Sequence, residues 1–138
     1  MKPIVVFTLA LLCVASPARA QKVVLTVERL GCERGVDIRQ VSARWLGRNT
    51  LEVVAYDGET PDWRVDAQSA WVHFDGAQLR LSYDQQQVTI APDRSDGRPV
   101  DMACLFPVRL TFGVTGLRHA RYQVWVTNGT SRKIDVDE

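Results

Sequence analysis

The sequence predicts an all-β protein, a single antiparallel β-sandwich of seven to nine strands, from three observations. Short runs rich in β-branched and aromatic residues alternate between apolar and polar side chains, which is the period of a strand with one buried face. Turn-forming residues separate these runs at short intervals. No segment keeps a helical period over its whole length. Together these features are typical of two sheets packed face to face.

The strongest strand pattern runs from Cys104 to Val126. Its first half carries apolar residues at every second position, namely Phe106, Val108, Leu110, Phe112 and Val114. After a corner at residues 116–120, Tyr122 and Val124 begin a second alternating run. The pattern predicts two consecutive strands with apolar inner faces.

Weaker patterns supply the remaining strands. Residues 23–28 are a β-branched run, residues 88–90 are a short strand before Pro92, and residues 131–136 are an edge strand. Residues 41–56 are typical of a hairpin with its turn at residues 47–49. Residues 36–46 also fit a helical spacing, but their short connection to the next strand favours a strand. Residues 57–68 contain Pro61, Trp63 and many charges, and they are predicted to be a long surface connection.

Asp75-Gly76 is the strongest hairpin signal, because both central residues of a type I′ turn need a positive φ. A two-residue loop would place the apolar residues of both flanking runs on one buried face. On the opposite face it would pair His73 with Gln78 and Trp71 with Arg80. The Arg80 guanidinium would then stack on a partly exposed Trp71 ring.

Residues 1–20 have the pattern of a cleaved secretion signal. An almost wholly apolar run follows Lys2, and Ala18-Arg19-Ala20 supplies the small residues that a signal peptidase accepts. An uncleaved membrane anchor is the alternative, but the apolar run is shorter than the roughly 20 residues that span a bilayer. Lipid attachment at Cys13 is disfavoured, because Leu12 stands where a lipoprotein signal has a small residue. We therefore expect a signal peptide at 1–20, a β-sandwich domain at 21–138 and a periplasmic or secreted location.

The charge balance excludes several partner classes. Removal of Lys2 and Arg19 with the signal leaves 15 of the 17 basic side chains against 16 acidic ones, a net charge near −1. Such a chain has no bulk field that attracts nucleic acid or an anionic membrane. We therefore expect neither nucleic-acid binding nor stable membrane insertion after signal cleavage. The length suits one domain with a single core.

Two cysteines remain after cleavage, Cys32 and Cys104, in a chain bound for an oxidising compartment. A disulfide between them is the default interpretation. A metal site or a reactive thiol is the alternative. It is disfavoured because neither cysteine has another Cys or a His at ligand spacing nearby.

Residues 114–129 carry a leucine, a short turn, a tyrosine and alternating valines, followed by Asn128-Gly129. This stretch resembles the corner between the fifth and sixth strands of fibronectin type III and related immunoglobulin-like domains. The resemblance implies an immunoglobulin-like sandwich in which Leu117 and Tyr122 hold a tyrosine corner, with the tyrosine hydroxyl bonded back to the backbone. The chain departs from the family at Arg118-His119, where the usual turn has Pro-Gly, and in its cysteine spacing. The resemblance implies no activity.

Catalytic motifs are absent from the sequence. It has no Gly-x-Ser-x-Gly, His-Glu-x-x-His or phosphate-loop pattern, and its two histidines are His73 and His119. The acids at positions 93, 96 and 101 do not have the spacing of a calcium loop. We therefore expect no enzyme activity, no metal site and no cofactor.

Aromatic residues at outward positions are the better indication of function. Trp71 and Trp125 have the outward parity of their strands, and Trp63 lies in the charged segment. Together with His73 and Arg80 they form the candidate binding surface, because exposed aromatic residues near Arg are enriched at interfaces. The alternative is that these rings fill the margins of the core or lie under loops. Trp45 shares the parity of Val41 and Ala43, so we place it in the core.

These observations favour a periplasmic or secreted binding module. Its partner would be another envelope or extracellular protein, or a glycan. An inhibitor or immunity protein is a narrower version of the same hypothesis. A structural spacer of the cell envelope is the alternative, and a small periplasmic hydrolase or redox protein is less favoured because it would need the catalytic motifs that are missing.

Overall fold

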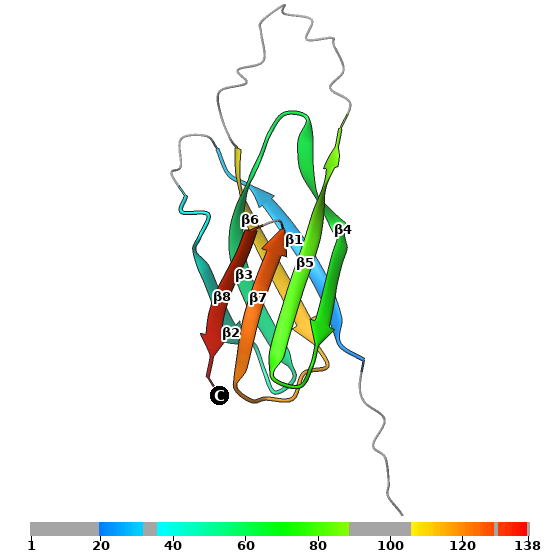
Figure 1. Cartoon of the computed structure of the whole chain (residues 1–138), viewed down its shortest axis with the longest axis vertical. Helices are drawn as coiled ribbons and strands as arrows, with labels where there is room; N and C mark the ends of the chain where they lie inside the picture. Colours follow the sequence, from blue (N-terminus) through cyan, green and yellow to red (C-terminus); the bar gives the residue numbers. More distant parts are fainter. Residues whose placement is uncertain (1–19, 32–35, 89–105, 129, 138) are drawn as a thin grey trace, which may run out of the picture.

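The computed structural model describes residues 20–31, 36–88, 106–128 and 130–137 of the chain (Figure 1). These residues form eight strands in two four-stranded sheets, with no helix among them. The first sheet has the order β1-β6-β3-β2, and the second has the order β4-β5-β7-β8. The strands are β1 (Lys22–Arg29), β2 (Val41–Trp45), β3 (Thr50–Glu59), β4 (Trp63–Phe74), β5 (Gln78–Gln87), β6 (Phe106–Thr115), β7 (Tyr122–Asn128) and β8 (Thr130–Val136). The predicted all-β class is confirmed.

The strand directions differ from the prediction at one pair. In the described sheets β5 and β7 run parallel, and the other strand pairs are antiparallel. The chain leaves the second sheet after β5, crosses the first sheet as β6, and returns as β7 (Figure 1). Each crossing reverses the chain, so two crossings restore the direction of β5. The prediction of a wholly antiparallel sandwich is therefore wrong for this pair.

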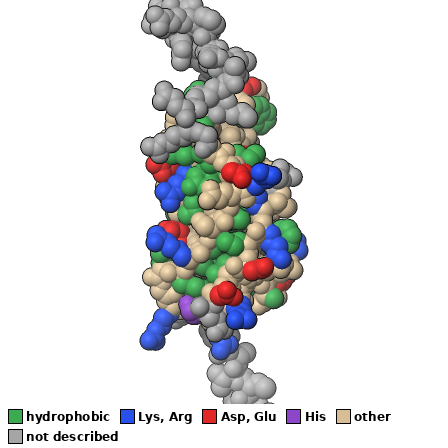
Figure 2. Space-filling model, turned by 90° about the vertical axis from the view of Figure 1, so that its left-hand side faces the viewer, with side chains coloured by type: hydrophobic (Ala, Val, Ile, Leu, Met, Phe, Trp, Pro, Cys, Tyr) green, Lys and Arg blue, Asp and Glu red, His purple; other side chains and the backbone are tan. Residues whose placement is uncertain are grey.

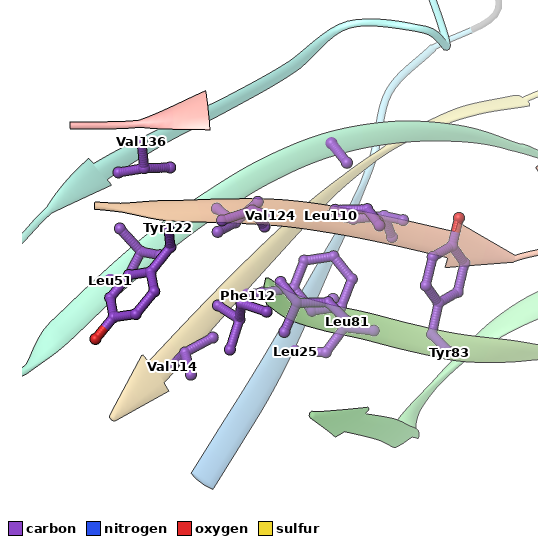
Figure 3. Packing of buried hydrophobic residues seen from close by; sticks show 14 of the residues in the cluster. Leu25, Leu51, Leu81, Tyr83, Leu110, Phe112, Val114, Tyr122, Val124 and Val136 are labelled. Atoms are coloured by element: carbon purple, nitrogen blue, oxygen red, sulfur yellow. The ribbon is translucent and has the colours of Figure 1, made fainter. Parts of the chain in front are cut away.

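The core lies between the sheets and draws on both of them. Its buried residues are Leu25, Leu51, Val53, Ala55, Val65, Leu79, Leu81, Tyr83, Val108, Leu110, Phe112, Val114, Leu117, Tyr122, Val124, Val126 and Val136. Figure 3 shows Tyr122 at one end of this cluster and Tyr83 at the other. The inward alternation predicted for β6 and β7 is confirmed, and Trp45 is half-buried against the cluster. Each fully buried Leu, Val or Phe side chain contributes roughly 1.5–3 kcal/mol.

The segment from residue 57 to residue 68 is not the predicted surface connection. β2 and β3 form the predicted hairpin, but β3 continues to Glu59, and β4 begins at Trp63 after a turn at residues 60–62. The polar composition of this segment wrongly indicated a surface loop. Asp57 and Glu59 share the inward parity of Ala55, and they form hydrogen bonds with polar partners between the sheets. The predicted long loop is therefore two ends of strands and a short turn.

The β4–β5 hairpin forms at the predicted place with a register that differs by two residues. Within its turn Gly76 alone has a positive φ, 97°, and the turn is centred on Gly76 and Ala77, as in a type II′ turn. Asp75 Oδ1 accepts hydrogen bonds from the backbone nitrogens of Ala77 at 3.3 Å and Gln78 at 2.8 Å. These bonds favour the observed turn over the predicted type I′ turn.

The shifted register changes the cross-strand pairs. Trp71 is opposite Ser82, and His73 is opposite Arg80. The predicted pairs of Trp71 with Arg80 and of His73 with Gln78 are therefore wrong. Because the shift is even, each of these side chains stays on its predicted face of the sheet.

The corner between β6 and β7 contains the local contact that a tyrosine corner requires. Leu117 and Tyr122 are buried, and the Tyr122 hydroxyl donates a hydrogen bond to the carbonyl oxygen of Arg118. Gly116 begins the corner with a φ of 83°. The wider immunoglobulin-like assignment stays a prediction.

Several expectations fall on other parts of the chain. Residues 1–19 of the predicted signal with Cys13, the Cys32–Cys104 disulfide, residues 89 and 90 of a predicted strand, and the acids at 93, 96 and 101 lie outside the described residues. Where the structure describes the chain, no helix has the length and apolarity needed to cross a membrane.

Candidate functional site

The outer face of the second sheet brings together four of the five residues of the predicted surface. His73 of β4 is opposite Arg80 of β5, and Arg80 is opposite Trp125 of β7. Lys133 of β8 is opposite Trp125 on its other side, so these four residues form one row across the sheet. Trp71 lies on the same face, two residues along β4 from His73. We call these five side chains the basic aromatic face.

The basic aromatic face is accessible to a partner. Trp71 is 53% exposed, and His73, Arg80 and Lys133 are also exposed. Trp125 is half-buried, and Lys133 Nζ lies 5.9 Å from the centroid of its ring. This distance is that of a cation–π contact. The row therefore presents a cation on each side of one indole ring.

Two glutamines beside the row link Arg80 to Trp125. Arg80 Nη2 donates to Gln78 Oε1 at 3.2 Å, and Gln78 Nε2 donates to Gln123 Oε1 at 3.3 Å. The Trp125 indole nitrogen donates to the same Gln123 oxygen at 3.2 Å. The parallel pairing of β5 and β7 sets the two glutamines opposite each other. Because hydrogen bonds already restrict the guanidinium and the indole, these side chains lose less conformational entropy when a partner binds.

Small polar side chains form the next row of the face. Trp71 is opposite Ser82, and this row continues through Thr127 to Ser131. An exposed indole at the edge strand thus stands beside three short side chains, and the hydroxyl oxygen of the nearest of them, Ser82, is buried.

Trp63 does not belong to this face. β4 and β5 pair with a register shift between Asp66 and Trp71, from Asp66 opposite Asp84 to Trp71 opposite Ser82. Between these two pairs β4 advances by five residues and β5 by two. Because the difference is odd, residues of β4 with the same parity point to opposite faces of the sheet before and after the shift. Trp63 therefore has the inward parity of Val65, at the far end of β4, although it is 43% exposed.

Lys133 is absent from the predicted surface. A sequence shows the outward parity of Lys133 on β8 but not that β8 pairs with β7, which sets Lys133 beside Trp125. Charges of both signs are spread along the neighbouring side of the molecule, where β2 and β8 are the sheet edges (Figure 2). The cluster of cations around Trp125 is therefore a local feature of a nearly neutral chain.

A partly buried polar network closes the end of the core at Tyr83. The Tyr83 hydroxyl donates to Asp57 Oδ2 at 2.5 Å and accepts a hydrogen bond from Arg132 Nη2 at 2.7 Å. Burial, and then the Asp57 carboxylate, raise the pKa of Tyr83, so the hydroxyl keeps its proton at neutral pH. Arg132 also donates to the carbonyl oxygens of Ile38 at 3.2 Å and of Tyr56. These bonds join three strands and the loop that precedes β2.

Asp57 and Glu59 have further partners in the same region. Asn128 Nδ2 and Gln85 Nε2 donate to Asp57 Oδ2 at 3.2 and 3.4 Å. Glu59, 2% exposed, accepts a hydrogen bond from the backbone nitrogen of Val65 at 2.9 Å and pairs with Arg29. Because these carboxylates are occupied by structural partners, the network acts in joining the sheets. Sequence reasoning missed it, and the only signal was the inward parity of Asp57 and Glu59 on β3.

A shallow depression at the opposite end of the molecule contains His119. Its lining includes Trp45, Gly47, Arg118 and His119, and the His119 ring lies 4.5 Å from the Trp45 ring, centroid to centroid. His119 thus packs on an aromatic ring. Among the described residues, no group of three or more His, Cys, Asp and Glu is arranged to hold a metal ion.

No protein-family model, curated protein or solved structure matches this chain. The basic aromatic face offers an exposed indole, a tethered indole and three basic side chains to one partner.

Proposed function

We propose that this chain is a periplasmic or secreted binding module that docks another protein on the basic aromatic face. One observation carries the proposal. Residues scattered from position 71 to position 133 meet in two adjacent rows of one sheet, with Trp71 53% exposed. Tryptophan and arginine are the residues that most often dominate the energy of protein interfaces.

The hydrogen bonds around the face support binding over a purely spacing role. A spacer needs no ordered side chains on an exposed sheet face. Here Gln78 and Gln123 link Arg80 to Trp125 without burying either charge or indole in the core. Such an arrangement lowers the ordering cost of complex formation.

The extracytoplasmic location in this proposal comes from residues 1–20, whose apolar run and Ala18-Arg19-Ala20 suit a secretion signal. The near-zero net charge after cleavage supports a specific partner rather than general attraction to a charged polymer. An inhibitor or immunity protein fits this description as a narrower case.

Affinity capture from the envelope fraction tests the proposal. The full-length chain is expressed with residues 1–20 in place, recovered after export, crosslinked in the extract and analysed by mass spectrometry. The same is done with a Trp71→Ala, Trp125→Ala double variant. A protein that crosslinks to the parent on β4, β5 or β7 and is lost with the double variant supports docking on this face.

Trp63→Ala is the matched control, because it removes an exposed indole from the same strand outside the face. Equal loss of the crosslinked protein with Trp63→Ala and with the double variant would contradict the proposed face. Recovery of the same protein by the parent, the double variant and Trp63→Ala would also contradict the proposed face. Thermal unfolding of each variant shows that the fold is retained.

A further inference from the structure

We propose that the partner segment that docks on the basic aromatic face is an acidic stretch of a protein chain. This inference rests on the proposed function and adds the chemistry of the partner. It follows from the charges in the row that contains Trp125, from the hydrogen bonds that orient Arg80, and from the exposed indole of Trp71.

The row has two positively charged side chains, Arg80 and Lys133. It contains His73, Arg80 and Lys133 and no acidic side chain. Among the described residues, Arg80 has no carboxylate within ion-pair distance, and its guanidinium is bonded to the neutral amide of Gln78. Lys133 Nζ lies 3.5 Å from Asp135 Oδ1 at the edge of the face. Asp75 at the β4–β5 turn is also within electrostatic reach of Arg80, so the positive charge prevails only within the row itself.

Arg80 is oriented for a carboxylate. The bond from Nη2 to Gln78 restricts the guanidinium, and among the described residues its other N–H groups have no ion-pair partner. A planar guanidinium held in this way binds a carboxylate through two parallel hydrogen bonds, and these are stronger than bonds between neutral groups.

The spacing of the cations suits an extended segment. Arg80 and Lys133 lie on strands two apart, which separates their backbones by about 10 Å. An extended chain covers this distance in about three residues. A short segment with two acidic residues therefore reaches both cations, while an apolar side chain beside them packs on Trp71 above the small residues of the next row.

A protein segment fits this combination better than a uniformly charged polymer does. Trp71 offers apolar surface that an acidic side chain cannot use, and the cations offer contacts that an apolar side chain cannot use. Proteins present both kinds of side chain within a few residues. We therefore take an acidic protein segment as the occupant, and an acidic polysaccharide becomes an outcome of the test.

The test uses two carboxylate polymers, a copolymer of glutamate and leucine, which combines acidic and apolar side chains, and polygalacturonate, which is uniformly charged. Each is titrated into the exported full-length chain, and tryptophan fluorescence and calorimetry report binding. We expect the glutamate–leucine copolymer to bind more tightly than polygalacturonate, with an affinity that falls as salt is added. An Arg80→Gln, Lys133→Gln double variant should bind the copolymer about tenfold more weakly or worse.

The control is Lys22→Gln, Arg109→Gln, which removes the same two charges from β1 and β6 on the outer face of the first sheet. Equal weakening by this control would overturn the inference, because attraction would then be non-specific. Tighter binding of polygalacturonate would also overturn it in favour of a glycan. The absence of any binding of the glutamate–leucine copolymer would overturn it as well. The crosslinking test with Trp71 and Trp125 does not depend on these results. Failure of the acidic-partner proposal can therefore be distinguished from failure of the proposed docking face.

Discussion

The hydroxyl of Tyr83 in one sheet lies 2.5 Å from the carboxylate of Asp57 in the other, and this pair marks where the apolar core ends. Toward Tyr122 the space between the sheets is filled by aliphatic and aromatic side chains (Figure 3). Beyond Tyr83 it is filled by hydrogen-bonded polar groups that include Arg132, 8% exposed. The sandwich is therefore held by packing over most of its length and by a polar network at one end, and the two parts respond differently to substitution.

Asp57→Ala should destabilise the fold by about 3 kcal/mol, because it leaves the Tyr83 hydroxyl and two amide groups without their acceptor. The measurement is urea unfolding at neutral pH. Asp84→Ala on the exposed side of β5 is the control and should change stability by less than about 0.5 kcal/mol. Similar losses for the two variants would show that the network does not join the sheets.

The raised pKa of Tyr83 predicts that the fold loses stability in alkali. Burial and the Asp57 carboxylate raise the pKa of Tyr83 above the value of about 10 that an unfolded tyrosine has. The stabilisation is complete below about pH 10, and above it the unfolded state releases a proton that the folded state retains. The unfolding free energy should then fall by about 1.4 kcal/mol per pH unit for this residue.

Tyr83→Phe tests this assignment. The variant should be less stable at neutral pH but should show a shallower decline in alkali than the parent. Burial raises the pKa of Tyr122 too, so a part of the slope should remain. Denaturant unfolding at several pH values above 9 or so gives both slopes. An unchanged slope in the variant would show that the Tyr83 pKa is not the cause.

Glu59 and Arg29 form an ion pair whose two partners should differ in importance. Glu59 is 2% exposed and also accepts the backbone nitrogen of Val65, whereas the Arg29 side chain is 49% exposed. Glu59→Ala should therefore cost about 3 kcal/mol, because a buried N–H and an arginine lose their acceptor. Arg29→Ala should cost about 1 kcal/mol or less, since water reaches that side chain. Chemical unfolding of both variants measures the difference, and equal costs would contradict this account.

Gly116→Ala should destabilise the corner before β7 by about 1–2 kcal/mol. Gly116 has a φ of 83°, and an added Cβ would lie 3.0 Å from the carbonyl oxygen of Ala20. Gly47→Ala is the control, because Gly47 has no positive φ and no atom within 4 Å of the new Cβ. It should be neutral or slightly stabilising. Thermal unfolding distinguishes the two, and a neutral Gly116→Ala would show that the corner relaxes without strain.

The outward positions of Trp71, His73, Arg80 and Trp125 could be predicted because the period of a strand fixes which side chains share a face. The predicted β4–β5 register was wrong by two residues and still kept these faces, since two is the period of the strand. The position of Trp63 could not be predicted in this way. Its parity relative to Trp71 depends on the irregular pairing between Asp66 and Trp71, which leaves no mark in the local alternation.

The sequence by itself determined the all-β class, most of the described strands and the inward or outward side of residues within each regular strand. These properties depend on local alternation and turn residues. Only the tertiary structure decided which strands are neighbours. The parallel pairing of β5 with β7 and the pairing of β7 with β8 set Arg80, Trp125 and Lys133 in one row, and the approach of the two sheets brought Tyr83 to Asp57. Such contacts arise from packing between residues distant in the chain, which a local pattern cannot specify.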